Sequence, residues 1–175
     1  MLSAVLRAVY SSVSLDPSLI EDVVVGNVLP PGGGASAARM ASLHAGIPNS
    51  SAVNTVNRQC SSGLTAINQI AMEILSGQID IGIGMTFDPL SSSLYQSNIV
   101  ILLVSGAGVE SMTQGHDARA MGSVSEKVLS NQEAADCLIP MGITSENVAA
   151  DFKISRDIQD DFAAKSFQKA AKAQV

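Results

Sequence analysis

The sequence predicts an α/β protein in which helices cover a largely parallel sheet. Short, β-branched apolar runs alternate with segments of helical periodicity along residues 2–84, which is the pattern of such a sheet. Apolar residues make up 46% of the 175, enough for a core, and only 3% are aromatic, so that core must be aliphatic. Fourteen glycines favour closely packed layers over a disordered chain.

Each element of this alternation follows from its local pattern. Leucines and valines spaced three and four residues apart predict the first helix, and short continuous β-branched runs predict buried strands. A Pro-Pro-Gly-Gly-Gly run separates the first strand from the next helix, and Gly46 and Gly77 end two helices. In chain order, the sequence predicts a helix over 2–13, a strand over 23–29, a helix over 36–45, a strand over 51–59, a helix over 64–75 and a strand over 79–84.

The second part of the chain has a different character. Residues 85–106 contain a proline, a serine cluster and an isolated apolar run, and they interrupt the alternation. The tail that follows is more polar and is predicted to be helical, with Thr144 and Ser155 as the N-caps of two helices. Asp161 and Lys165 are predicted to form an ion pair across one turn of the last helix.

Composition excludes several classes of protein. The net charge of −6 argues against a nucleic-acid-binding surface, which needs clustered Lys and Arg. The longest strongly apolar run, residues 99–104, is too short to cross a bilayer. Cys60 and Cys137 do not make a disulfide framework, and together with His44 and His116 they lack the spacing of metal ligands, so neither secretion nor a metal site is expected.

Cys60 is the strongest candidate for chemistry. It is expected where a buried strand ends and a helix begins, next to unpaired backbone N–H groups and the positive end of the helix dipole, both of which favour the thiolate. The small residues Ser61, Ser62 and Gly63 leave room for a substrate, and the N–H of Cys60 can face a developing oxyanion. Position alone leaves one alternative open, a buried core cysteine.

The residues around Cys60 resemble a known signature. The run Val-Asn-Arg-Gln-Cys-Ser-Ser-Gly-Leu-Thr-Ala-Ile over residues 56–67 closely resembles the nucleophile motif of the thiolases, and it looks most like the peroxisomal type of 3-ketoacyl-CoA thiolase. The resemblance extends over nearly the whole chain except residues 85–106. Further family-like pieces lie, in the family's order, at residues 25–29, 108–113, 136–148, 154–156 and 170–174.

The resemblance implies an acyltransferase reaction of fatty acid β-oxidation. The thiolate of Cys60 attacks the keto carbonyl of a 3-ketoacyl-CoA, acetyl-CoA leaves, and the shortened acyl group stays on Cys60 until coenzyme A removes it. Coenzyme A is thus a co-substrate, and no permanently bound cofactor is expected. Met141 and Gly142 match a loop segment that lines the acyl and pantetheine pocket in the family.

The resemblance also implies how the chain is divided. The thiolase fold has two similar halves, with a helical loop domain inserted in the first. Residues 1–113 match an incomplete N-terminal half of the layered βαβα type, and residues 114–175 match part of the loop domain. The first strand and the second half are expected to be absent, and with the second half a histidine that activates the nucleophile and a second cysteine that handles protons. This chain is therefore expected to be inactive alone.

Residues 85–106 are an insertion relative to the family pattern. Without them, Gly84 runs directly into Ala107 and restores a continuous family-like strand and turn. One hypothesis is a translated, unspliced intron of in-frame length, and the alternative is a loop specific to one lineage. The uncharged, β-prone run over residues 98–104 predicts low solubility, because such runs pair with open sheet edges.

Alternatives for function, assembly and location stay open. Within the enzyme class, the alternative is an acetoacetyl-CoA thiolase running in the condensing direction. Outside it are a non-catalytic truncated product that only dimerises, through the strand over residues 51–59, and a redox sensor based on the lone thiol of Cys60. The resemblance implies an acyl-CoA substrate, a homodimer or tetramer for the full-length family member, and a peroxisomal location, with a mitochondrial or cytoplasmic location as the alternative.

The remaining candidates are assigned structural roles. The three glycines over residues 32–34 are not followed by the Lys-Ser/Thr of a phosphate-binding loop, so a flexible loop is expected there. Glu110 and Cys137 are expected to be structural, and His44 and His116 match no catalytic position of the family. A solvated helix face is predicted from Lys165, Lys169 and Lys172.

Overall fold

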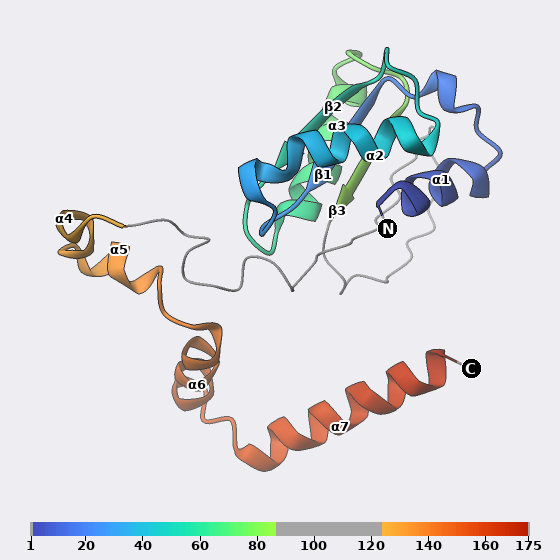
Figure 1. The fold of residues 1–175 in the computed structure, drawn as a ribbon. Helices are drawn as coiled ribbons and strands as arrows, with labels where there is room; N and C mark the ends of the chain where they lie inside the picture. Colours follow the sequence, from blue (N-terminus) through green and yellow to red (C-terminus); the bar gives the residue numbers. More distant parts are fainter. Residues whose placement is uncertain (1, 87–123, 175) are drawn as a thin grey trace. The chain divides into compact units, whose positions relative to one another are not determined.

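The computed structural model describes residues 2–86 and 124–174 (Figure 1). The chain divides into two compact units, residues 1–122 and residues 123–175, and each is described by itself. Several predicted features lie outside the described residues. These are the boundary between residues 113 and 114, Glu110, His116, the apolar run over 99–104 and residues 87–106 of the predicted insertion.

The first unit alternates helices and parallel strands, which confirms the predicted α/β class. The helices predicted over 2–13 and 36–45 are confirmed within one residue at each end. In chain order, the elements are α1 (Leu2–Ser12), η1 (Pro17–Leu19), β1 (Asp22–Gly26), η2 (Pro31–Gly34), α2 (Ala35–Ala45), β2 (Ala52–Val56), α3 (Ser62–Leu75) and β3 (Gly82–Thr86).

The described sheet has three parallel strands in the order β2-β1-β3. In its register, Val24 of β1 lies opposite Asn54 of β2 and Gly84 of β3. The central strand β1 therefore has a strand on each side, and since Val23, Val24 and Val25 are all buried, both of its faces are covered as well. A continuous apolar run is typical of a strand in this position.

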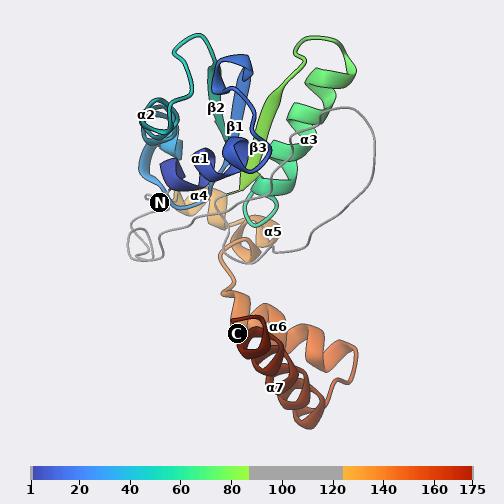
Figure 2. The same cartoon turned by 90° about the vertical axis from the view of Figure 1, so that its right-hand side faces the viewer.

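Helices cover the sheet in two layers, with α1 and α2 on one face and α3 on the other (Figure 2). Val23 and Val25 belong to the larger core cluster, which includes Leu6 of α1. Val24 packs instead with Ala66 and Ile70 of α3. Alternate residues of β1 thus face opposite layers, because side chains alternate across the pleat of a strand.

Glycines let α3 approach the sheet closely. A Cβ atom added to Gly84 would lie 2.8 Å from the Cα atom of Ile67, and one added to Gly82 would lie 2.9 Å from the Cδ1 atom of Ile70. Both distances are below ordinary van der Waals contact. The contact at Gly84 is with the backbone of α3, so the strand and the helix pack there at a separation that only glycine permits, whereas the contact at Gly82 is with a side-chain end.

β2 is shorter than the predicted strand. The sequence predicts a strand to Gln59, but the N–H of Arg58 donates to Oγ of Ser62 (2.8 Å) and the N–H of Gln59 donates to Oδ1 of Asn57 (3.0 Å). These backbone groups are therefore paired with side chains in a turn rather than with a neighbouring strand. β1 likewise ends at Gly26, three residues before the predicted end.

β3 begins and ends later than predicted. The N–H groups of Asp80 and Ile81 both donate to Oε2 of Glu21, at 2.6 and 3.1 Å, so these residues precede the strand instead of opening it. At the other end, Met85 and Thr86 belong to β3, although they begin the predicted insertion. Met85 is fully buried in the larger core cluster.

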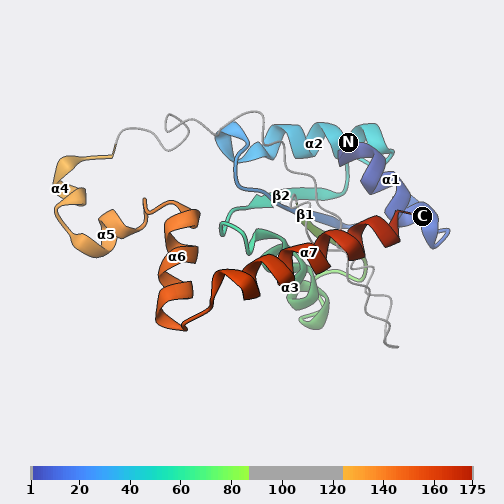
Figure 3. The same ribbon diagram turned by 90° about the horizontal axis from the view of Figure 1, so that it is seen from below.

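The second unit is helical in its described part, as predicted for the tail. Figure 3 shows α6 leading through a short turn into α7. Among the described helices of the whole chain, none combines the length and the apolarity needed to cross a membrane. The helices of this unit are α4 (Glu126–Leu129), α5 (Gln132–Asp136), α6 (Met141–Asp151) and α7 (Arg156–Ala173).

The predicted N-cap at Thr144 is wrong. α6 begins at Met141 with Pro140 in the N-cap position, and the N–H of Thr144 donates to the carbonyl of Pro140 (3.1 Å) inside the first turn. Proline lacks an N–H group and favours helix starts, so the helix begins one turn earlier than the Thr144 hydroxyl suggests.

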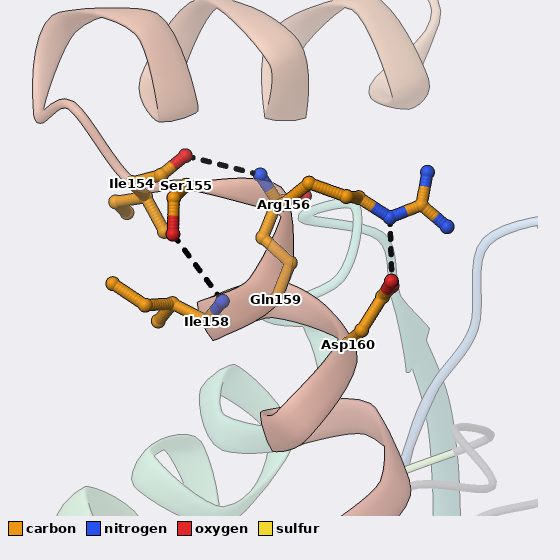
Figure 4. Close-up of polar contacts among 6 residues, drawn as sticks. All are labelled: Ile154, Ser155, Arg156, Ile158, Gln159 and Asp160. Carbon is orange, nitrogen blue, oxygen red and sulfur yellow. Dashed lines mark hydrogen bonds and ion pairs between the residues drawn. The ribbon is translucent and has the colours of Figure 1, made fainter.

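The predicted N-cap at Ser155 is confirmed. Its Oγ atom accepts a hydrogen bond from the N–H of Ile158, as Figure 4 shows. One turn on, Nε of Arg156 lies 2.7 Å from Oδ1 of Asp160, and this hydrogen bond raises the pKa of Arg156. The predicted ion pair between Lys165 and Asp161 is also present, with Nζ 2.6 Å from Oδ2. Both pairs are well exposed, so they add little stability.

Candidate active site

Cys60 lies on the turn that joins β2 to α3. Its thiol is free and exposed, which contradicts the alternative of a buried core cysteine. The helix that follows begins at Ser62, two residues earlier than predicted, and no side chain caps its N-terminus. The partial positive charge of the helix end therefore lies next to the thiol.

The residue before Cys60 has an unusual backbone conformation. Gln59 has a φ angle of 52°, in the left-handed region that residues with a Cβ atom rarely adopt. The side chain of Asn57 supports this conformation, because its Oδ1 accepts from the N–H of Gln59 and its Nδ2 donates to the carbonyl of Val28 (3.1 Å). The turn is therefore sharp, and its shape depends on contacts with the chain beyond β1.

Ser62 makes the most contacts within the turn. Its Oγ atom accepts from the N–H of Arg58 (2.8 Å), and it lies 2.5 Å from the carbonyl of Gln59 and 3.2 Å from the carbonyl of Asn27. The side chain is 2% exposed. One hydroxyl group thus connects the start of α3, the turn before Cys60 and the residue after β1.

The end of β1 contacts the same helix start. A Cβ atom added to Gly26 would lie 2.5 Å from the carbonyl carbon of Ser62 and 2.7 Å from the nitrogen of Gly63. No side chain fits between these backbones. Gly26 therefore sets how closely the N-terminus of α3, and the thiol beside it, approach the central strand.

Asn27 connects this region to the glycine run before α2. Its N–H donates to the carbonyl of Val56 (3.0 Å) and its Nδ2 to the carbonyl of Gly33 (2.7 Å). The run is a tight turn, and Gly32, Gly33 and Gly34 all have left-handed φ angles between 62° and 69°. The side chain of Asn27 is buried, and so it fixes the turn to the sheet.

Sequence reasoning located Cys60 but missed the side chains that shape its turn. Asn27, Asn57 and Ser62 bond backbone groups of the turn or of the residues around it. A signal for Asn57 does exist, since Asn often bonds the N–H group two residues further on. The contact of Asn27 with Gly33 spans 6 residues and that of Ser62 with Asn27 spans 35, and neither carries a local signal of that kind.

The other predicted site residues lie in the second unit. Met141 and Gly142 form the first turn of α6, where Met141 is exposed and a Cβ atom added to Gly142 would meet nothing within 4 Å. Their part in an acyl pocket stays a prediction.

The other cysteine, Cys137, and the described histidine, His44, do not lie on a turn at a helix N-terminus as Cys60 does. Cys137 follows α5 and is exposed, with its Sγ atom 3.5 Å from the carbonyl of Glu133. His44 lies in the last turn of α2, where its carbonyl accepts from Nη2 of Arg7 (2.8 Å). Among the described residues, no three His, Cys, Asp or Glu side chains gather where they could hold a metal ion.

A family model described as the thiolase N-terminal domain matches this chain over residues 1–107 and residues 91–175. The two matched stretches overlap within and just beyond the predicted insertion. The strongest piece of the resemblance, around Cys60, lies inside the first stretch.

Two curated relatives are similar over essentially the whole chain. The chain is 47% identical over 175 residues to a peroxisomal 3-ketoacyl-CoA thiolase of Yarrowia lipolytica, and 48% identical over 174 residues to peroxisomal 3-ketoacyl-CoA thiolase B of Rattus norvegicus. These alignments cover 100% and 99% of this chain, but 37% and 36% of the relatives. The chain therefore spans little more than a third of their length.

Solved structures share the fold. The dimeric peroxisomal thiolase of Saccharomyces cerevisiae matches with a TM-score of 0.77 and 46% identity, over 98% of this chain and 40% of that one. The Acat5 thiolase of Ascaris suum, solved in complex with coenzyme A, matches with a TM-score of 0.67 and 26% identity, over 99% of this chain and 42% of that one.

Proposed function

Since this chain belongs to the thiolase family, we propose that it carries the acyl-accepting nucleophile of a 3-ketoacyl-CoA thiolase and that this nucleophile is Cys60. One observation carries the proposal: the free thiol is exposed on a tight turn at the uncapped N-terminus of α3. The helix end places backbone N–H groups beside the thiol, and the exposed position admits a substrate. The similarity to peroxisomal 3-ketoacyl-CoA thiolases supports the substrate class.

The proposed chemistry has two half-reactions. In the first, the sulfur of Cys60 bonds to the keto carbon of the substrate, the bond from that carbon to the neighbouring methylene carbon breaks, and a proton converts the released fragment into acetyl-CoA. In the second, the sulfur of coenzyme A attacks the thioester, the bond to Cys60 breaks, and the shortened acyl-CoA leaves. The proton of the coenzyme A thiol balances the one consumed in the first step.

Oxyanion stabilisation and proton transfer are separate requirements. The N–H group of Cys60, at the start of α3, is suited to stabilise the oxyanion that forms in each half-reaction. The resemblance assigns proton transfer to a histidine and a second cysteine of the family's second half. Acylation of Cys60 is therefore tested separately from the complete reaction.

Coenzyme A is the proposed co-substrate. The Ascaris suum thiolase was solved as a complex with coenzyme A, which supports this assignment by similarity. Met141 and Gly142, in the first turn of α6, are the residues proposed to line the acyl and pantetheine pocket. A Cβ atom added to Gly142 would meet nothing within 4 Å, so a ligand has space at this position.

We further propose that a second copy pairs along β2. This strand forms an edge of the described sheet, with β1 on one side. An edge strand presents unpaired backbone groups to another strand. The similar thiolase of Saccharomyces cerevisiae is described as dimeric, which supports pairing of two copies.

A peroxisomal location is proposed for this chain. The similar curated relatives are named as peroxisomal, which supports it.

Mass spectrometry of the intact chain tests the acyl-acceptor role. After incubation with acetoacetyl-CoA, we expect an acetyl group on Cys60, no label on the Cys60→Ser variant and an unchanged label on the Cys137→Ser control. Persistence of the label in Cys60→Ser overturns the assignment. A longer 3-ketoacyl-CoA tests the substrate class, because labelling by acetoacetyl-CoA alone supports the acetoacetyl-CoA thiolase alternative.

A non-catalytic product that only dimerises is the second candidate, and the position of β2 at an edge of the described sheet favours it. Such a product forms dimers in sedimentation experiments but leaves Cys60 unlabelled by either substrate. Labelled Cys60 in a chain that also dimerises supports the acyl-acceptor role over this candidate.

A further inference from the structure

We propose that Ser62 is a positioning residue, whose hydroxyl group holds the thiol of Cys60 at the N-terminus of α3. The consequence for acyl transfer rests on the proposed function, whereas the consequence for the reactivity of the thiol does not. Ser62 lies two residues after Cys60, and its side chain points back into the turn, where it contacts the two residues before the thiol.

The hydroxyl group bonds both ends of the two-residue segment Arg58–Gln59 that precedes Cys60. Oγ of Ser62 accepts from the N–H of Arg58 (2.8 Å) and donates to the carbonyl of Gln59 (2.5 Å). A hydroxyl group has one donor and two acceptor sites, so it can serve both backbone groups at once. The backbone around Gln59 is thereby held in its left-handed conformation, which costs free energy that surrounding contacts must offset.

The same hydroxyl group connects the turn to the sheet. Oγ lies 3.2 Å from the carbonyl of Asn27, which directly follows the central strand β1. The residue before it, Gly26, contacts the backbone of Ser62 so closely that a Cβ atom would clash. The turn is therefore positioned against the central strand β1, and this contact also positions the thiol on the turn.

Burial makes the hydroxyl group hard to replace. Ser62 is 2% exposed, so water is excluded from the place of a missing Oγ atom. Truncation to alanine removes the partner of the N–H of Arg58 and leaves the carbonyl of Gln59 with only the backbone N–H of Ser62, so two hydrogen bonds that hold the turn are lost. The neighbouring Ser61 is exposed and bonds the carbonyl of Arg58 (2.9 Å), so water can replace its hydroxyl group.

Alkylation of the two cysteines in one chain tests the proposal without any substrate. Iodoacetamide modification is followed by peptide mass spectrometry at several pH values, and exposed Cys137 in the second unit is the internal reference. For Ser62→Ala, we expect the Cys60 rate relative to Cys137 to fall about tenfold near neutral pH and its pH profile to change, because the thiol loses its fixed place at the helix end.

Ser51→Ala is the matched control. Ser51 is also 2% exposed, and its Oγ atom donates to the carbonyl of Ile20. This contact lies just before the start of β1, whereas Cys60 lies beyond the end of β2. This variant should lose stability like Ser62→Ala while keeping the wild-type Cys60 rate and pH profile. Ser62→Thr, which retains a hydroxyl group, should recover most of the rate if it folds.

Two results overturn the proposal: an unchanged Cys60 rate and pH profile in folded Ser62→Ala, or an equal change in Ser51→Ala. Acyl labelling by acetoacetyl-CoA separates this proposal from the proposed function. If wild-type Cys60 accepts an acyl group and Ser62→Ala does so at the same rate, the positioning role is wrong and the function stands. If wild-type Cys60 is not acylated but its alkylation still depends on Ser62, the function is wrong and the positioning role stands.

Discussion

The hydroxyl group of Ser62 lies 3.2 Å from the carbonyl of Asn27, so the helix after Cys60 is connected directly to the end of the central strand. This contact joins residues 35 positions apart. It lies on the buried side of the turn, whereas the thiol lies on the exposed side. A reactive group on a turn thereby gains the rigidity of the sheet.

Gly26→Ala should destabilise the first unit by at least about 2 kcal/mol, because the new Cβ atom meets backbone atoms of Ser62 that cannot rotate away. Urea denaturation followed by circular dichroism measures the loss. Gly142→Ala is the control, since its Cβ atom would enter open space within α6 and should be neutral or slightly stabilising. Equal stability of the two variants would contradict the close packing of β1 against α3.

Substitutions at Gln59 should follow the left-handed backbone. Gln59→Gly should gain about 0.5–1 kcal/mol, because glycine adopts this conformation without the Cβ clash. Gln59→Val should lose about 1–2 kcal/mol, because β-branching worsens that clash. Lys153→Gly is the positive control: Lys153 lies in the second unit with a similar φ angle of 54°, so its replacement by glycine should be stabilising for the same reason. A Val variant as stable as wild type would show that the turn is not left-handed.

Asp22→Asn should stabilise the protein at neutral pH and have little effect near pH 3. Burial, and secondarily the carboxylate of Glu73, raises the pKa of Asp22 in the folded state. A raised pKa means that the free energy of unfolding falls as the pH rises from the usual pKa of the carboxyl group through its pKa in the folded state. Removal of the charge on Asp22 should therefore raise the free energy of unfolding at pH 7 by less than about 1 kcal/mol, because solvent screens the repulsion between Asp22 and Glu73. Denaturation curves at both pH values test the sign, and a loss at pH 7 contradicts it.

Glu21→Gln should have the opposite pH dependence. The N–H groups of Asp80 and Ile81 donate to this carboxylate and lower its pKa in the folded state. The charged form thus adds stability above its usual pKa, and this contribution is lost as the pH falls through the lowered value. We expect the variant to melt below wild type at pH 7 and the difference to shrink towards pH 3. A difference that grows on acidification rules out this role.

The retained-intron hypothesis predicts that a spliced, shorter transcript exists, in which the codon of Gly84 joins that of Ala107. Sequencing of transcripts across this junction tests the retained-intron hypothesis. In the shorter chain, Ala107 would take the ladder position of Met85 opposite Val25. Absence of any shorter transcript leaves a lineage-specific loop as the origin of the segment.

Local patterns were sufficient for much of the fold and for the place of Cys60. The periodicity of α1, the Gly46 stop of α2 and the Ser155 cap depend on neighbouring residues, and all are confirmed. The β-branched run also predicts β1, although the strand ends three residues before its predicted end. Cys60 was located because a strand and a helix meet there, which is also a local feature. The Thr144 cap failed because a proline four residues earlier was the stronger start signal.

The sequence by itself determined that this chain is an alternation of strands and helices, with a thiol at one junction that resembles the thiolase nucleophile. Only the tertiary structure decided where the strands end and how the thiol is held. Glu21 pairs with residues 59 and 60 positions away, and Ser62 with one 35 positions away. Such contacts depend on which elements become neighbours in the folded layers, and no local periodicity encodes that.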